Sequence, residues 1–172
     1  MPFDINAFKA VISPTDFARP ALFNVLVSTP SGVAPLIPVS PFLVRAASLP
    51  GSTMGEVAIP YGGRVVKIAG ERAYGDWGIT VMNDEGFIMR RALESWIEKM
   101  NGRVSNFRSF PNEYKVDLTI NQFSKKGPPI SVIKMVGCFP TALGDIGVDW
   151  GSANAIEEYS VTWAYDYWDV VL

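Results

Sequence analysis

Hydrophobic and polar residues alternate over several stretches of this chain, with the two-residue period of half-buried β-strands. The clearest stretch, residues 156–167, has one aromatic or apolar face and one small or polar face. The first face holds Tyr159, Val161, Trp163, Tyr165 and Tyr167, and the second holds Glu158, Ser160, Thr162, Ala164 and Asp166. The same criterion predicts further strands over residues 21–28, 42–49, 64–69, 77–82, 114–123 and 130–139.

Turn-forming residues separate these strands. Four prolines and a glycine within residues 29–41 predict a loop. The turn-rich string Pro50-Gly-Ser-Thr-Met-Gly55 and the glycines of Tyr61-Gly-Gly63 predict a second loop over residues 50–63, which we expect to be exposed. The strands at 64–69 and 77–82 are then expected to pair as an antiparallel hairpin, joined by residues 70–76.

One stretch has the 3.6-residue period of a helix instead. Over residues 85–100 the apolar side chains share one helical face, which consists of Ile88, Met89, Ala92, Leu93, Trp96, Ile97 and Met100. Asn83 or Asp84 supplies an N-cap, and Asn101-Gly102 is suited to a left-handed helix end. We interpret this stretch as a helix that covers one side of a sheet, in preference to a membrane or cofactor helix.

This order of elements predicts a mainly β fold, an antiparallel β-sandwich or barrel with one flanking α-helix at about residues 85–100. A length of 172 residues suits one domain with its own hydrophobic core. We therefore expect residues 1–172 to form a single domain. Within it, residues 1–20 are expected to form an N-terminal arm and residues 50–63 an exposed loop.

Composition narrows the possible functions. The formal net charge of −2 gives no electrostatic reason to bind DNA phosphates. The sequence has no histidine, which removes the commonest general base, the commonest metal ligand and every catalytic triad built on imidazole. The N-terminal residues do not resemble a secretory signal, and no apolar run is long enough to span a bilayer, so we expect synthesis in a cytoplasm.

Carboxylates stand beside aromatic residues at several points, as they do in glycosidases and sugar-binding clefts. Asp76-Trp77 and Asp149-Trp150 are two such pairs. Tryptophan more often buries a large area in a core, and aspartate is common at turns and strand ends. We therefore favour a structural interpretation of these pairs.

Two further patterns could carry chemistry. Tyr61-Gly-Gly-Arg64 combines a flexible backbone with an arginine, and it lacks the spacing of the phosphate-binding glycine motifs. Cys138, the single cysteine, lies within a predicted strand and has no histidine to activate it, which favours a buried thiol. The sequence thus predicts no catalytic, cofactor-binding or metal-binding residue, and no enzymatic activity.

A series of short strings spans residues 16–168. It comprises Asp16-Phe-Ala-Arg-Pro20, Ser48-Leu-Pro50, Ala69-Gly-Glu-Arg72, Asp76-Trp77, Thr80-Val-Met-Asn-Asp-Glu85, Phe139-Pro-Thr141, Asp149-Trp150, Asn154-Ala-Ile156 and Asp166-Tyr-Trp168. In content and order these strings resemble the tail tube family of contractile-tailed bacteriophages. Each string is weak alone, and their collinearity over nearly the whole chain makes the resemblance specific.

The resemblance implies a structural subunit of the phage tail, with six copies in a ring, inner sheets joined into one barrel, and rings stacked into a hollow tube. The implied partners are the tail sheath outside the tube and the baseplate initiator and terminator proteins of the tube. The lumen would hold the tape-measure protein and pass double-stranded DNA without sequence-specific binding. The implied location is the virion, after synthesis and assembly in the host cytoplasm, with no cofactor and no membrane insertion.

Two segments are candidates for self-assembly interfaces, because flexible protrusions can become ordered on a neighbour. They are the N-terminal segment and residues 52–64, and the candidate residues are Asp16, Phe17, Arg19, Ser52, Met54, Tyr61 and Arg64. For the lumen we expect a polar, neutral to acidic lining that passes DNA without holding it. The candidates there are Glu158, Ser160 and Thr162, although alternation does not say which face turns to the channel.

Other functions remain open at this stage. The tube proteins of type VI secretion systems, pyocins and extracellular contractile systems would share the fold and assembly. A tube-junction or baseplate paralogue is a second alternative. A monomeric carbohydrate-binding β-sandwich or glycosidase is a third, since a fold does not fix a function; glycan binding by a monomer would favour it.

Overall fold

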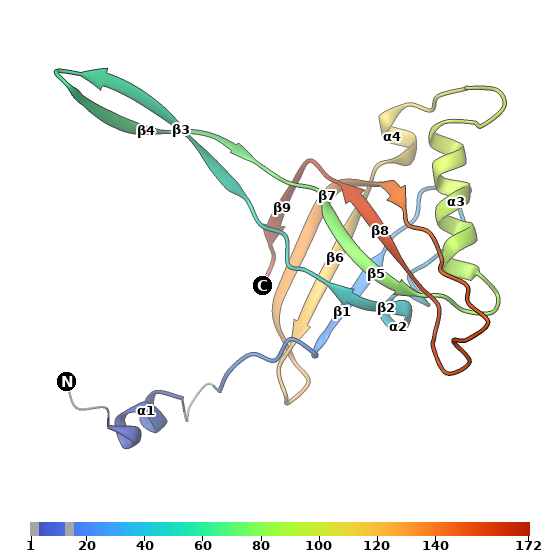
Figure 1. The fold of residues 1–172 in the computed structure, drawn as a ribbon, viewed down its shortest axis with the longest axis horizontal. Coiled ribbons are helices and arrows are strands. Elements are labelled where there is room, and N and C mark those ends of the chain that lie inside the picture. Colours follow the sequence, from blue (N-terminus) through green and yellow to red (C-terminus); the bar gives the residue numbers. More distant parts are fainter. Residues whose placement is uncertain (1–3, 13–15) are drawn as a thin grey trace.

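The structure is a computed structural model that describes residues 4–12 and 16–172. These residues contain nine strands and four helices (Figure 1). The helices are α1 (Ile5–Ile12), α2 (Ser40–Leu43), α3 (Ile88–Met100) and α4 (Pro111–Tyr114). The strands are β1 (Phe23–Val27), β2 (Val44–Ala47), β3 (Thr53–Tyr61), β4 (Arg64–Ala73), β5 (Trp77–Met82), β6 (Val116–Phe123), β7 (Pro129–Leu143), β8 (Glu158–Ala164) and β9 (Tyr167–Val170).

Seven strands form one curled antiparallel sheet in the order β1-β6-β7-β8-β5-β2, with β9 added beside β7. Strand β7 is 15 residues long and belongs to two layers. Its first part pairs with β6 and β9, and its last part pairs with β8. The result is a layer β1-β6-β7-β9 facing a layer β7-β8-β5-β2, so β1 and β2 come close at the far side. The predicted mainly β, antiparallel sandwich or barrel is confirmed.

A β-bulge at Gly137 lets β7 pass from one layer to the other. The register with β6 slips between Met135 and Cys138, and Gly137 has a φ of +69°, a conformation that glycine adopts without strain. The Gly137 N–H donates to the Asp117 carboxylate at 3.2 Å. The Lys134 ammonium, 2.8 Å from the same carboxylate, lowers the pKa of Asp117.

The core lies between the two layers and under α3. One layer contributes Val25, Val27, Leu118, Ile120 and Met135, and the other contributes Trp77, Ile79, Val81, Tyr159, Val161 and Trp163. Helix α3 adds Met89, Ala92, Leu93 and Trp96 along one side of the sheets (Figure 1). The rings of Trp96 and Trp163 meet edge to face, with their centroids 5.4 Å apart.

The predicted flanking helix is confirmed, and it begins at Ile88 instead of residue 85. The reason is a tight turn in front of it, in which Phe87 takes a left-handed φ of +52°. Asp84 still satisfies the helix start, because its carboxylate accepts the Ile88 N–H at 3.1 Å.

The predicted pairing of residues 64–69 with 77–82 is wrong. Residues 64–73 pair with 53–61 instead, so β3 and β4 form their own two-stranded sheet. The expected loop at 50–63 is exposed as predicted, but most of it is strand β3. Pro50 and the glycines of this stretch predicted a loop, whereas only Gly62 and Gly63 make the turn, with positive φ at both positions as a two-residue hairpin needs.

Four strand predictions were too long. Those at 21–28 and 114–123 exceed β1 and β6 by a few residues, and residue 114 belongs to α4. The other two differ more. Residues 40–43 form the short helix α2, so the strand predicted at 42–49 is reduced to β2. The strand predicted at 156–167 ends at Ala164, because the chain reverses there and returns as β9 alongside β7. The alternation was correct over β8, where Tyr159, Val161 and Trp163 are buried.

Candidate assembly surfaces

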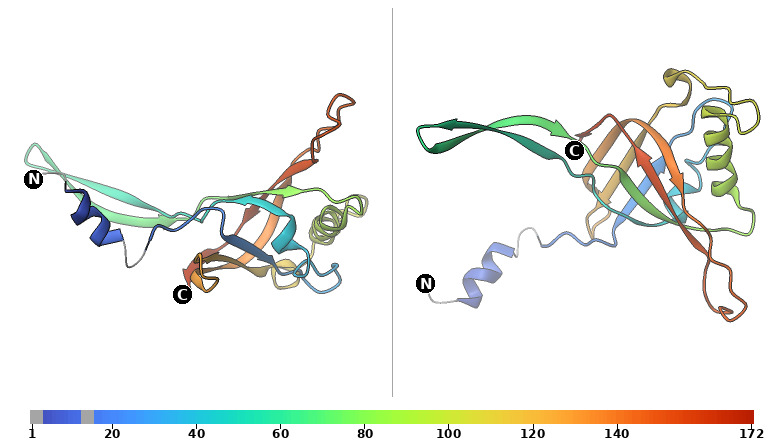
Figure 2. Two further views of the ribbon diagram at one scale, coloured as in Figure 1. Left: turned by 90° about the horizontal axis from the view of Figure 1, so that it is seen from below. Right: turned by 45° about the horizontal axis from the view of Figure 1, so that its top comes forward.

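The hairpin of β3 and β4 extends away from the rest of the protein (Figures 1 and 2). Paired residues lie on the same face of a hairpin, and the pairs Val57 with Ile68 and Ile59 with Val66 make one face apolar. We call Val57, Ile59, Tyr61, Val66 and Ile68 the apolar hairpin face, and all five side chains are exposed. A two-stranded hairpin is only marginally stable in water without packing. This face is therefore suited to contact another protein surface.

The opposite hairpin face is more polar. Glu56 and Lys67 form an ion pair there, with 2.9 Å between Oε2 and Nζ. Ala58, Pro60 and Val65 complete this face. The hairpin is thus amphipathic, although neither face touches the core of its own chain.

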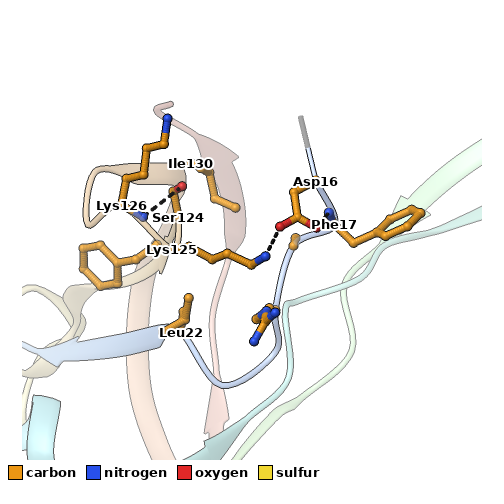
Figure 3. Close-up of a pocket in the computed structure, with 10 residues that line it drawn as sticks. Asp16, Phe17, Leu22, Ser124, Lys125, Lys126 and Ile130 are labelled. Atoms are coloured by element: carbon orange, nitrogen blue, oxygen red, sulfur yellow. Dashed lines mark hydrogen bonds and ion pairs between the residues drawn. The ribbon is translucent and has the colours of Figure 1, made fainter. Parts of the chain in front are cut away.

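The N-terminal arm carries the other group of predicted interface residues. The Asp16 carboxylate pairs with Lys125 in the turn between β6 and β7, and Figure 3 shows this contact. The arm and the turn enclose a pocket of about 300 Å³ lined by Asp16, Phe17, Arg19 and Lys125 among others. The Phe17 side chain is 65% exposed and points away from the turn in Figure 3. The ion pair fixes where the arm leaves the body.

Helix α1 is part of this arm and lies apart from the sheets (Figure 1). It buries no residue, and its apolar side chains Ile5, Phe8 and Val11 are exposed. Like the apolar hairpin face, this helix presents apolar surface that its own chain does not cover.

The seven predicted interface residues thus lie on two separate protrusions. Asp16, Phe17 and Arg19 are on the arm, and Ser52, Met54, Tyr61 and Arg64 are on or just before the hairpin. All seven are exposed, and Tyr61 and Arg64 stand opposite each other at the hairpin tip. Their role in assembly stays a prediction.

The outer face of β2, β5 and β8 is flat and lined by small residues. Ala46, Gly78, Thr80, Ser160 and Thr162 form a shallow depression there. At its border Glu158 pairs with Arg45, so the one carboxylate of this face is matched by a cation. Because Arg45 is paired with Glu158, this surface has no excess positive charge that would hold a polyanion.

Both edges of this layer are available for pairing. Among the described strands, β2 pairs only with β5. Residues 139–143 of β7 pair only with β8 within the same part of the chain. Open edges of this kind are the usual place for a strand of another chain to add.

The exposure of Trp150 was not predicted from the sequence. Tryptophan was expected to be buried, which is correct for Trp77, Trp96 and Trp163. Trp150 is fully exposed, on the loop of residues 144–157 between β7 and β8. The absence of any alternation around it was the available signal, because Asp149-Trp150 is followed by Gly, Ser, Ala and Asn.

The sugar-site pattern at Asp76-Trp77 does not form a binding platform. The Trp77 ring is buried, and its Nε1–H donates to the Ser48 carbonyl at 2.6 Å. Across residues 4–12 and 16–172, no three histidine, cysteine or acidic side chains gather as metal ligands would. None of the helices described is long and apolar enough to cross a membrane.

Cys138 is fully buried, as predicted, and burial raises the pKa of its thiol to about 12. Since the thiolate is the reactive form, we expect native protein to resist a chromogenic disulfide reagent at about pH 9, where an ordinary thiol reacts. Unfolding in urea should release one reactive thiol per chain. Rapid labelling of the native protein would contradict the burial of this residue.

Comparison with known proteins gives consistent matches. The family described as phage tail tube protein matches residues 27–171. Tail tube protein gp19 of Enterobacteria phage T4 is 32% identical over 156 residues, covering 90% of this chain and 92% of that protein.

Solved structures share the fold at lower identity. A chain of the sheath/tube terminator of the extracellular contractile injection system PVC, in its extended state, has a TM-score of 0.66 at 18% identity, covering 92% of this chain and 99% of its own. A chain of the anti-feeding prophage baseplate, determined with six-fold symmetry, has a TM-score of 0.63 at 12% identity, covering 87% and 91%.

Proposed function

Because the chain belongs to the phage tail tube protein family, we propose that six copies form a ring and that rings stack into a hollow tube. The protein is a structural subunit of a contractile phage tail and hence a component of the virion. The single observation that carries the proposal is the pair of open edges on the layer β7-β8-β5-β2. The six-fold symmetry of the anti-feeding prophage baseplate supports the number six.

The ring is closed by strand pairing between neighbours. All pairs in the layer are antiparallel, so β2 and β7 at its two edges run in opposite directions. The β2 strand of one copy therefore lies antiparallel to β7 of the next, and the sheet continues without a change of pattern. A head-to-tail contact of this type closes into a ring when its rotation divides a full circle.

The flat outer face of β2, β5 and β8 lines the lumen in this arrangement. Gly78, Thr80, Ser160 and Thr162 then face the channel, and Glu158 with Arg45 adds no net charge. Phosphate binding depends on releasing counterions from a basic surface, which this face does not offer. The tape-measure protein can thus fill the lumen, and double-stranded DNA can pass through it, without tight binding to the wall.

The hairpin of β3 and β4, the N-terminal arm and the outer surface of the tube make the contacts other than the pairing of β2 with β7. The hairpin, with Ser52, Met54, Tyr61 and Arg64, joins successive rings. The N-terminal arm, with Asp16, Phe17 and Arg19, also contributes to the contact between rings. The sheath surrounds the tube, and initiator and terminator proteins bind its ends. We further infer assembly in the host cytoplasm and a purely structural, non-enzymatic role.

A cysteine pair tests the ring contact. Ala46 and Ala142 are exposed. Each lies opposite a residue of the flat face on the neighbouring strand, Ala46 opposite Thr80 and Ala142 opposite Thr162. We propose a register in which residue 46 of one copy lies opposite residue 142 of the next, so that in the Ala46→Cys, Ala142→Cys variant the two thiols come within the distance that a disulfide needs. Oxidation should give a ladder of covalent species that ends at six chains.

The control is Ala46→Cys alone, which should remain uncrosslinked because β2 does not meet another β2 in a head-to-tail ring. A ladder that stops at two chains, or assembled material without any cross-link, would contradict the proposed pairing of β2 with β7.

A further inference from the structure

The loop of residues 144–157 carries apolar side chains that its own chain leaves uncovered. Trp150 is 105% exposed, and Val148 and Ile156 are also exposed. Figures 1 and 2 show the loop projecting from the body at the end opposite to the hairpin of β3 and β4. An exposed tryptophan flanked by apolar residues is typical of a contact anchor.

The base of this loop is held in place. The Gly144 N–H donates to the Ser160 carbonyl at 2.7 Å, and the Arg90 guanidinium donates to the Gly144 carbonyl at 2.6 Å. At the other end, the Asn83 N–H donates to the Glu157 carbonyl at 2.8 Å. These bonds anchor both ends of the loop to the sheet and to α3.

The turn that bears Trp150 is also ordered. The Asp149 carboxylate accepts the Gly151 N–H and the Ser152 hydroxyl, each at 3.2 Å. A side chain presented on a fixed turn loses less conformational entropy on binding than one on a disordered loop. The loop is therefore preorganised for contact.

The charges of loop and hairpin are complementary. Residues 144–157 contain Asp145, Asp149 and Glu157 and no lysine or arginine. Arg64 stands at the hairpin tip on the same side as Tyr61, and it belongs to none of the ion pairs found among the described residues. An arginine guanidinium can stack on a tryptophan ring as well as pair with a carboxylate.

We propose that the loop of residues 144–157 is the surface onto which the apolar hairpin face of the copy in the next ring docks. Arg64 stacks on Trp150 and approaches Asp145, while Val148 and Ile156 cover the apolar hairpin face. The contact is head to tail, so each copy donates its hairpin at one end and accepts another at its opposite end. This inference rests on the proposed tube, because it needs a second copy stacked along the axis.

Cross-linking between two variants that each add one cysteine tests the contact directly. Cys138 is buried and does not interfere. Tyr61→Cys mixed with Val148→Cys should give a covalent dimer on oxidation of assembled material. The matched control is Val65→Cys with Val148→Cys, which places the thiol on the other hairpin face and should give at least about tenfold less dimer.

Trp150→Ala provides the second measurement. Loss of an aromatic anchor typically weakens an interface by 10-fold or more, so we expect the protein concentration required for tubes to rise by about 10-fold or more. The covalent six-chain species of the ring variant should still form. Val104→Ala, a truncation of a 98% exposed residue on the loop after α3, should leave the required concentration unchanged.

The outcomes separate this inference from the proposed function. Tubes that form normally with Trp150→Ala and show no Tyr61 to Val148 cross-link would overturn the inference and leave the tube intact. Normal tubes that no longer accept sheath would overturn it too, by assigning Trp150 to the sheath. Wild-type protein that forms neither rings nor tubes would overturn the proposed function itself.

Discussion

The variant Ile59→Asp, Val66→Asp should fold normally and form no tubes at concentrations where the wild type assembles. These two residues pair across the hairpin and form the centre of its apolar face. Each buried side chain of this size contributes about 1.5–3 kcal/mol, so losing both weakens the contact between rings by about 10²- to 10⁴-fold. Electron microscopy should show isolated rings or single subunits.

The matched control is Ala58→Asp, Val65→Asp, which adds the same two carboxylates to the opposite hairpin face. It also places one aspartate on each of β3 and β4, so it reports whether added charge on the hairpin alone prevents assembly. If both variants formed tubes equally well, the hairpin would not be the axial contact. If both failed equally, hairpin stability would be the cause.

Trp96→Ala should produce a large loss of stability, about 3–5 kcal/mol in the free energy of unfolding. The Trp96 side chain is fully buried, and its ring meets Trp163 at 5.4 Å between centroids. Its Nε1–H donates to the Tyr114 carbonyl at 3.0 Å, so truncation leaves a cavity and removes a hydrogen bond. Urea titration followed by far-UV circular dichroism measures the change.

This measurement is made in the Ile59→Asp, Val66→Asp background, because assembly would otherwise stabilise the folded state by mass action. Trp150→Ala is the control: it removes the same side chain from an exposed site and should change the free energy of unfolding by less than about 0.5 kcal/mol. Equal losses for the two tryptophans would contradict the core described here.

The layers and the helix could be predicted because burial imposes its period on the sequence. Over β8, the alternation of Tyr159, Val161 and Trp163 with polar residues follows from one buried face. Over α3, Met89, Leu93 and Trp96 recur at helical spacing for the same reason. Both elements face the core of their own chain, so intramolecular packing decides which positions are apolar.

The hairpin could not be predicted in this way, since its own chain buries neither face. Without a core to impose a pattern, Pro50 and the glycines determined the prediction of a loop, and strand β3 was missed. The apolar positions of β3 and β4 do alternate. This alternation is explained by burial only if another molecule covers the apolar hairpin face. Interfaces between copies leave a weaker signal in one sequence than a core does.

The candidate assembly surfaces were likewise predictable only in part. The exposure of Tyr61, Arg64 and Phe17 was foreseen, because turn residues and an irregular start indicate protrusions. The exposure of Trp150 was not foreseen, since composition alone favours burial of tryptophan. Only the fold shows that its loop stands at the end opposite to the hairpin (Figure 2).

Electron microscopy of the purified wild-type protein over a concentration series tests whether the protein forms a six-membered tube. We predict hollow tubes built from six-membered rings, with the layer β7-β8-β5-β2 continuous around the lumen and Thr80, Ser160 and Thr162 facing it. A tube in which that layer faces outward, or protein that stays monomeric at every concentration even on added tube ends, would contradict this prediction.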